Sequence, residues 1–145
     1  MATKKKVFVS FDYENDKHYK YLLEAWHAND DFDFVFNDKT PTEINSTNIG
    51  RIKAGLTIKI KEATHTLVIA GKEANKEHRN HGLIGYRNWI NFEVAQSIEH
   101  GNCLAVVRLE RGNSLPEEVF NGKYALAEGY TEDNIISVLN RAPQN

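Results

Sequence analysis

The sequence has a single cysteine, Cys103, among 145 residues, which excludes an internal disulfide framework. Its position directly before the apolar run LAVVRL predicts a small buried core residue rather than a nucleophile. The formal net charge is only -2, which gives no bulk attraction to nucleic acid or to anionic membranes. We therefore expect partners that are neither nucleic acids nor membranes.

Long apolar runs are also missing. No segment approaches the roughly 18 consecutive apolar residues that a membrane span needs. The opening run KKKVFVSF is interrupted by Asp12 and the polar residues after it, which argues against a secretory signal peptide. These two absences predict a cytoplasmic protein.

Several common signatures of site chemistry are absent as well. Neither a GxGxxG motif nor a P-loop occurs, which disfavours dinucleotide binding by those modes, and there is no GxSxG nucleophile elbow. His78 and His81 form an H-x-x-H pair without a nearby cysteine or an obvious third ligand. We interpret them as solvent-facing loop residues and predict no metal site.

The chain does contain short apolar runs that alternate with helical periods. Strands are predicted over 7–13, 32–38, 64–71, 103–109 and 124–130, and helices over 16–29, 49–63, 86–101 and 131–142, with a short turn over 115–120. Asp16 and Thr131 are candidate N-caps, the acidic segment DYEND before the first helix is expected to be a loop, and Gly101 ends the third helix. The pattern predicts one α/β domain over residues 1–145, a doubly wound five-stranded parallel sheet with the flavodoxin-like order 2-1-3-4-5.

Ligands of such sheets bind outside the carboxyl ends of the strands, where the strand order reverses. The residues that this rule selects, apart from the start of the helix within 86–101, are Ser10, Phe11, Asp12, Tyr13, Asn37, Asp38, Gly71, Lys72 and Glu73. In that helix, Glu93 lies about 40° from Trp89 around the axis, beside the apolar stripe. An acid early in a helix can simply favour the macrodipole and reach solvent, so periodicity alone leaves its role open.

Three segments in this order resemble a known family. They are KVFVSFDYEND, IKEATHTLVIAG, and the W-x-x-x-E pattern formed by Trp89 and Glu93. Together they resemble the TIR-like domains of bacteria, especially the ThsB subunits of Thoeris anti-phage defence systems. The resemblance covers nearly the whole chain, and it implies a flavodoxin-like fold.

The resemblance also implies an activity, because many members of the family cleave the nicotinamide–ribose bond of NAD. The family's catalytic glutamate corresponds to Glu93 and the preceding aromatic residue to Trp89, while the strand-end loop of the nucleotide pocket corresponds to residues 10–13. In Thoeris relatives the product resembles a cyclised or conjugated ADP-ribose that activates a separate NAD-destroying effector. We therefore expect NAD as the substrate with no further cofactor, self-association, and a phage-derived trigger.

Two other interpretations remain open. The chain could be a non-enzymatic TIR-like module that acts through self-association, with Glu93 in a structural role. It could also be a nucleoside deoxyribosyltransferase, which uses a similar fold and a glutamate nucleophile. The segment KTPTEINST lacks the hydrophobic and proline signature of animal signalling TIR domains, which argues against adaptor-style assembly through that loop.

Overall fold

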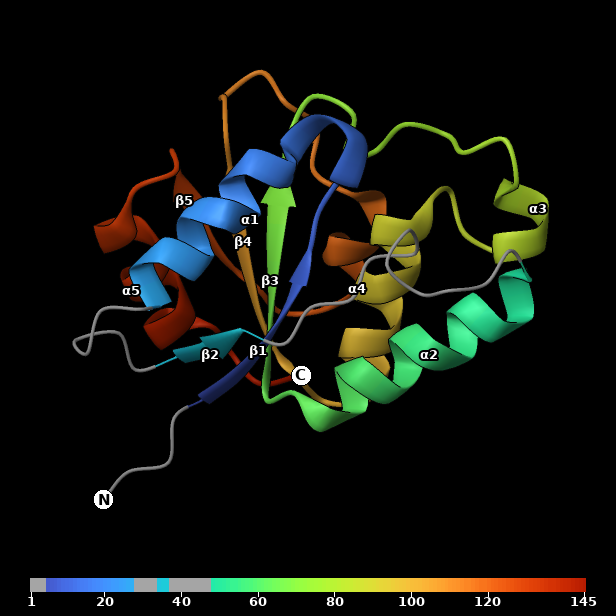
Figure 1. Ribbon diagram of the computed structural model, residues 1–145, viewed down its shortest axis with the longest axis horizontal. Helices are drawn as coiled ribbons and strands as arrows, with labels where there is room; N and C mark the ends of the chain where they lie inside the picture. Colours follow the sequence, from blue (N-terminus) through green and yellow to red (C-terminus); the bar gives the residue numbers. More distant parts are fainter. Residues whose placement is uncertain (1–4, 28–33, 37–47) are drawn as a thin grey trace.

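The computed structural model describes residues 5–27, 34–36 and 48–145. One parallel sheet runs through the molecule in the order β2-β1-β3-β4-β5 (Figure 1). Its strands are β1 (Lys5–Ser10), β2 (Phe34–Phe36), β3 (His65–Ala70), β4 (Cys103–Arg108) and β5 (Ala125–Glu128). Four of these strands make the body of the sheet, and the three-residue β2 pairs with β1 at one edge. The α/β class and the parallel strand order are those that the sequence predicts.

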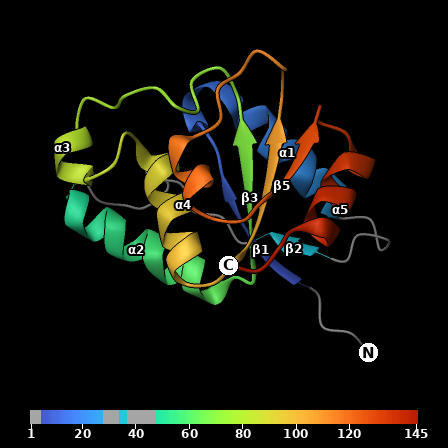
Figure 2. The ribbon, with the colours of Figure 1, turned by 180° about the vertical axis from the view of Figure 1, so that it is seen from behind.

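Helices cover both faces of the sheet (Figures 1 and 2). They are α1 (Tyr13–His27), α2 (Ile49–Glu62), α3 (His81–Ile84), α4 (Trp89–Glu99), the short 3-10 helix η1 (Glu117–Asn121) and α5 (Glu132–Arg141). Helices α1 and α5 lie on one face, and α2 and α4 on the other. In the part of the chain that the structure describes, none of these helices is long and apolar enough to cross a membrane.

Strand β3 is the centre of the core, and all six of its residues are buried. Leu67 and Ile69 pack towards α1 and α5, whereas Val68 and Ala70 pack towards α4. Successive side chains of a strand point to opposite faces, so a strand covered on both sides needs a continuous apolar run rather than an alternating one. The run THTLVIAG has this property, and β3 occupies it as predicted.

The junction between β1 and α1 differs from the prediction. Strand β1 ends at Ser10 and α1 already begins at Tyr13, so DYEND is not a loop and Asp16 is not the N-cap. Asp12 takes that place: its Oδ1 accepts from the backbone N–H of Glu14 at 3.1 Å, and its carbonyl accepts from that of Asp16 at 2.7 Å. Acidic side chains in a first turn are favoured by the helix dipole, which allows the helix to start one turn earlier.

Other predicted ends are present. Thr131 caps α5, its side chain accepting from the N–H of Asn134 at 3.1 Å, and Gly101 follows α4 with a left-handed φ of 76°. Short helix α3 lies in the polar segment between β3 and α4, where the sequence pattern predicts no regular element. Cys103 is half-buried rather than buried; it is the first residue of β4 and forms an isolated bridge with Gln144. Asn37 and Asp38, predicted at the end of the second strand, lie outside the described residues.

Three asparagines fix the start of α4, and we call them the asparagine cluster: Asn75, Asn88 and Asn91. The Asn88 side chain caps the helix by accepting from the N–H of Asn91, and it donates to the carbonyls of Ala74 and Lys76, all at 2.9 Å. Asn91 Nδ2 donates to Asn75 Oδ1 at 3.1 Å. The cluster therefore ties the segment after β3 to the first turn of α4.

We predict that Asn88→Ala destabilises the protein by about 2–3 kcal/mol, because it removes a helix cap and also two donors to the carbonyls of the preceding segment. Thr131→Ala removes only an exposed cap and should cost about 1 kcal/mol. Urea unfolding of the two variants measures the difference. Equal losses in the two variants would show that the asparagine cluster adds nothing beyond capping.

Candidate functional site

The structure brings together two of the predicted residues, Ser10 and Glu93. Ser10 is the last residue of β1, and Glu93 lies in the second turn of α4. The Ser10 hydroxyl donates a hydrogen bond to Glu93 Oε1 at 2.8 Å. Glu93 is 2% exposed and Ser10 is completely buried. Glu93 is therefore not a solvated surface acid, and its carboxyl faces the carboxyl end of the first strand.

Burial controls the ionisation of Glu93. Removal from water raises its pKa to about 8, and the hydrogen bond from Ser10 opposes this rise. No charged side chain in the described part of the chain contributes to the shift. The other oxygen, Oε2, has no hydrogen-bond partner among the described residues. The site at neutral pH thus holds a mostly protonated carboxyl with one oxygen held and the other uncommitted.

Trp89 lies one turn before Glu93, as the first residue of α4. It is half-buried, and its ring meets that of Phe92 edge to face at a centroid distance of 5.8 Å. Both rings belong to the cluster that packs α2 against α4 and Phe8. Trp89 is thus a partly accessible aromatic group on the helix that carries Glu93.

The remaining predicted site residues are placed differently. Phe11 is 4% exposed and packs in the core on the α1 and α5 face, the sheet face opposite α4. Asp12 is the cap of α1, and it also accepts from Asn15 Nδ2 at 2.6 Å. Tyr13 begins α1, but its side chain, like Asn37 and Asp38, lies outside the described set. The structure therefore does not place Phe11 beside Glu93, because strand alternation turns it to the other face.

Gly71 follows β3, and the carboxyl of Asp16 lies directly against it. A Cβ at Gly71 would stand 2.1 Å from Asp16 Oδ2, so only glycine allows this approach. Asp16 is 7% exposed, and burial, reinforced by nearby Asp12, raises its pKa to about 6. Its Oδ2 is completely buried without a hydrogen-bond partner in the described part of the chain. The two residues line a cavity of about 230 Å³ between α1 and the segments after β3 and β4.

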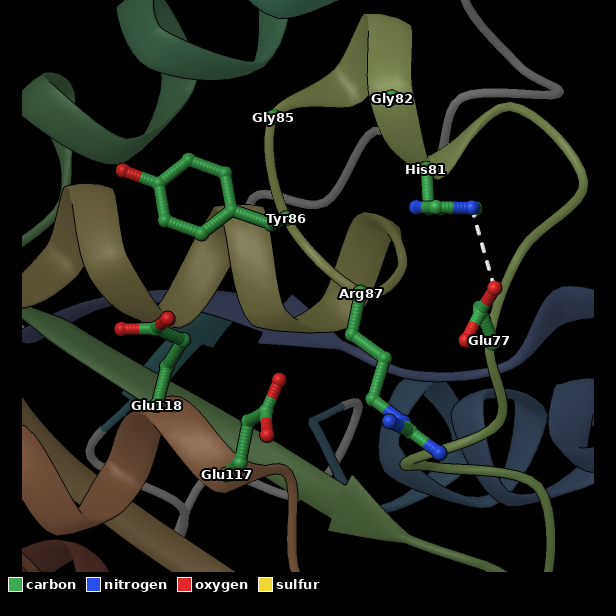
Figure 3. A pocket seen from close by; sticks show the side chains of 8 residues that line it. All are labelled: Glu77, His81, Gly82, Gly85, Tyr86, Arg87, Glu117 and Glu118. Carbon is green, nitrogen blue, oxygen red and sulfur yellow. Dashed lines mark ion pairs between the residues drawn. The ribbon is translucent and has the colours of Figure 1, made fainter.

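A larger hollow of about 440 Å³ lies between α3, the start of α4 and η1 (Figure 3). Glu117 and Glu118 line it from η1, and Arg87 and His81 from the segment before α4. His81 Nε2 is 3.0 Å from Glu77 Oε1. The described residues contain no group of three or more potential metal ligands. Neither Ser10 nor Glu93 lines this hollow or the cavity at Asp16.

The sequence pattern does not predict the polar side chains that join α4 to the sheet. The Ser97 hydroxyl donates to the Glu93 carbonyl at 2.7 Å and shares a second hydrogen bond of 2.7 Å with Thr66. The asparagine cluster was equally unforeseen. The only signal available was the density of polar residues on a helix that must lie against an apolar sheet, since such groups need partners when buried.

Comparison with known proteins gives one family. The sequence model described as "Thoeris protein ThsB, TIR-like domain" matches residues 8–114. No protein with a curated description matches the chain. Among solved structures, the 2-deoxyribosyltransferase from the psychrotolerant bacterium Bacillus psychrosaccharolyticus is similar, with a TM-score of 0.56 and 15% sequence identity over 89% of this chain and 90% of that one. At this identity the likeness is one of fold.

We predict that Glu93→Gln removes a pH dependence of stability. In the unfolded chain the carboxyl titrates near 4.5, so between pH 4.5 and about 8 the unfolded state loses a proton that the folded state keeps. The contribution of Glu93 to stability therefore falls as the pH rises through this window. The stability of the glutamine variant relative to wild type should rise by up to about 1.4 kcal/mol per pH unit, measured by urea unfolding. A constant difference across the window would contradict the raised pKa.

We also predict that Gly71→Ala destabilises the protein by about 1–3 kcal/mol, because the new methyl group overlaps the Asp16 carboxyl. In an Asp16→Ala background the same substitution should cost much less, since the overlapping group is gone. Thermal or urea unfolding of the four proteins gives this coupling energy as a double-mutant cycle. An unchanged cost in both backgrounds would assign the effect of Gly71→Ala to another contact.

Proposed function

Because the chain belongs to the TIR-like domain family of the Thoeris protein ThsB, we propose that it cleaves the nicotinamide–ribose bond of NAD. One observation carries the proposal. A buried carboxyl, Glu93, is held by the strand-end residue Ser10 at 2.8 Å, at the edge of the sheet where ligands of this architecture bind.

The chemistry requires an anion near the ribose. When the bond between ribose C1′ and the nicotinamide nitrogen breaks, its electron pair leaves with neutral nicotinamide, and positive charge develops on the ribose. An ionised Glu93 stabilises this charge through the uncommitted oxygen Oε2. Water attack at C1′ then yields ADP-ribose and releases a proton. A nucleophile within the folded nucleotide, or on a second small molecule, yields a cyclic or conjugated product instead.

The raised pKa of Glu93 fits this sequence of events. In the substrate-free protein the carboxyl is mostly protonated at neutral pH, because burial raises its pKa to about 8. A cationic nicotinamide ring placed nearby lowers that pKa and favours the carboxylate. The anion is then formed where the positive charge will develop. Trp89, half-buried on the same helix, is the aromatic group that we assign to stacking on the substrate.

The family match supports a role in anti-phage defence. We propose that the product is a cyclic or conjugated ADP-ribose that acts as a messenger in anti-phage defence. It would act on a separate effector protein in the cytoplasm after a phage-derived trigger and self-association of the chain. The reaction uses NAD as substrate, and the proposed role of Glu93 requires no additional cofactor.

Two alternatives make different demands on the same residues. A self-associating module without activity needs Glu93 only for structure. A nucleoside deoxyribosyltransferase needs the carboxylate as a nucleophile on a deoxyribose, and the similarity to the Bacillus psychrosaccharolyticus enzyme extends to the fold of that class. The substrates separate all three, since only the first proposal predicts nicotinamide release from NAD.

We predict that Glu93→Gln lowers NAD turnover by at least about 100-fold, because the amide cannot supply the negative charge. Purified protein is incubated with NAD, alone and with extract of phage-infected cells, and nicotinamide and nucleotide products are followed by mass spectrometry. Deoxynucleosides with a free base are tested in parallel.

The matched control is Glu99→Gln, which neutralises an exposed acid at the other end of α4 and should leave turnover unchanged. Full turnover in Glu93→Gln would overturn the assignment of Glu93. Base exchange on deoxynucleosides without nicotinamide release would support the transferase. Neither reaction under either condition would support the interaction module.

A further inference from the structure

Two buried hydroxyl groups contact Glu93, and they contact different parts of it. Ser10 Oγ donates to the carboxyl oxygen Oε1 at 2.8 Å, and Ser97 Oγ donates to the backbone carbonyl at 2.7 Å. Both serines are completely buried. The two serines can therefore be compared directly: the Ser10 hydroxyl bonds to the carboxyl of Glu93, whereas the Ser97 hydroxyl bonds only to its backbone.

Ser10 stands on a rigid support. It is the last residue of β1, where it pairs in register with Val68 of β3, and β3 in turn pairs with β4. Glu93, in contrast, has a long side chain with several rotatable bonds. A donor fixed by the sheet can hold one carboxyl oxygen in a single position, whereas α4 alone fixes only the start of the side chain.

We propose that Ser10 is a positioning residue for Glu93: its hydroxyl holds Oε1, presents Oε2 alone to the ribose, and favours the ionised carboxylate. The inference rests on the proposed function for the reaction itself. The contact between the two side chains stands independently of the reaction. Ser10, predicted from the strand-end rule as a substrate contact, thus acts through the glutamate, because its single hydroxyl proton is committed to Oε1.

No other group in the described structure competes for this role. The elements packed against α4 are β1, α2, β3, β4 and η1. Among their described residues no acidic, basic or histidine side chain shifts the pKa of Glu93, and Ser10 supplies the only hydrogen bond that lowers it. Lys53 of α2 lies near α4, but its ammonium stands over the ring of Phe92, 5.5 Å from the centroid. Without the Ser10 hydroxyl, nothing in the described structure should oppose the rise that burial causes in the pKa of Glu93.

The test measures ionisation and turnover separately. The side-chain carboxyl of Glu93 is titrated by carbon-13 NMR in the substrate-free full chain, in wild type, Ser10→Ala and Ser97→Ala. We expect the pKa of Glu93 to rise by about one to two pH units in Ser10→Ala, the value of one hydrogen bond to a charged group. Ser97→Ala should leave it unchanged, because that hydroxyl does not touch the carboxyl. Ser10→Cys, with a weaker donor of similar size, should give an intermediate shift and serves if the alanine variant is unstable.

The pH dependence of NAD turnover should shift in the same direction as the pKa of Glu93. In Ser10→Ala, kcat/KM at neutral pH should fall about 10-fold or more and should recover partly as the pH is raised past the new pKa. Ser97→Ala should retain the wild-type pH profile. Equal pKa values of Glu93 in the two alanine variants, or a loss of kcat/KM that is the same at every pH, would overturn the proposal. A displaced pKa in a protein that releases no nicotinamide would support the Ser10 contact and refute the proposed function instead.

Discussion

Helix α4 is enclosed by the sheet, α2 and η1, and this enclosure is the constraint on which the site depends. Six of its residues are buried, and three of the six are polar: Asn91, Glu93 and Ser97. A polar group taken out of water must find a partner inside the protein or lose its charge. Each of these three side chains has a partner outside α4: Asn91 bonds to Asn75 in the segment after β3, Glu93 to Ser10 of β1, and Ser97 to Thr66 of β3. The hydrogen bonds of these buried polar side chains connect α4 to β1, to β3 and to the segment after β3.

Those connections give the site its rigidity. The asparagine cluster fixes where α4 begins, Ser97 joins its third turn to Thr66 of β3, and Ser10 joins Glu93 to the end of β1. The carboxyl of Glu93 is thus positioned by α4 and β1, and by the buried hydrogen bonds that join α4 to β3, rather than by a loop. Such a placement suits electrostatic stabilisation, which depends on groups that are oriented before the charge appears.

The sequence carried the class, the strand order and the position of Glu93 because these follow from periodicity and from the chirality of parallel crossovers. It misjudged the start of α1, because it placed the cap at Asp16, whereas Asp12, the same residue type four positions earlier, caps the helix. It also assigned Phe11 to the ligand pocket by its place at a strand end, although alternation from Val9 turns it into the opposite core. Partners of buried polar groups, such as Asn75 for Asn91, come from distant segments and leave no local pattern.

The Glu93 carboxyl also bears on which ligand the protein can prefer. A group that is neutral while the site is empty spares the fold a permanent buried charge, so the cost of ionisation falls on the bound state. A ligand that brings its own positive charge compensates that cost. Binding of such a ligand exchanges a proton for a cation and leaves the net charge of the site unchanged. Under the proposed function, these charges would favour a nucleotide with a pyridinium ring over its reduced, uncharged counterpart, without any contact to the atom at which the two differ.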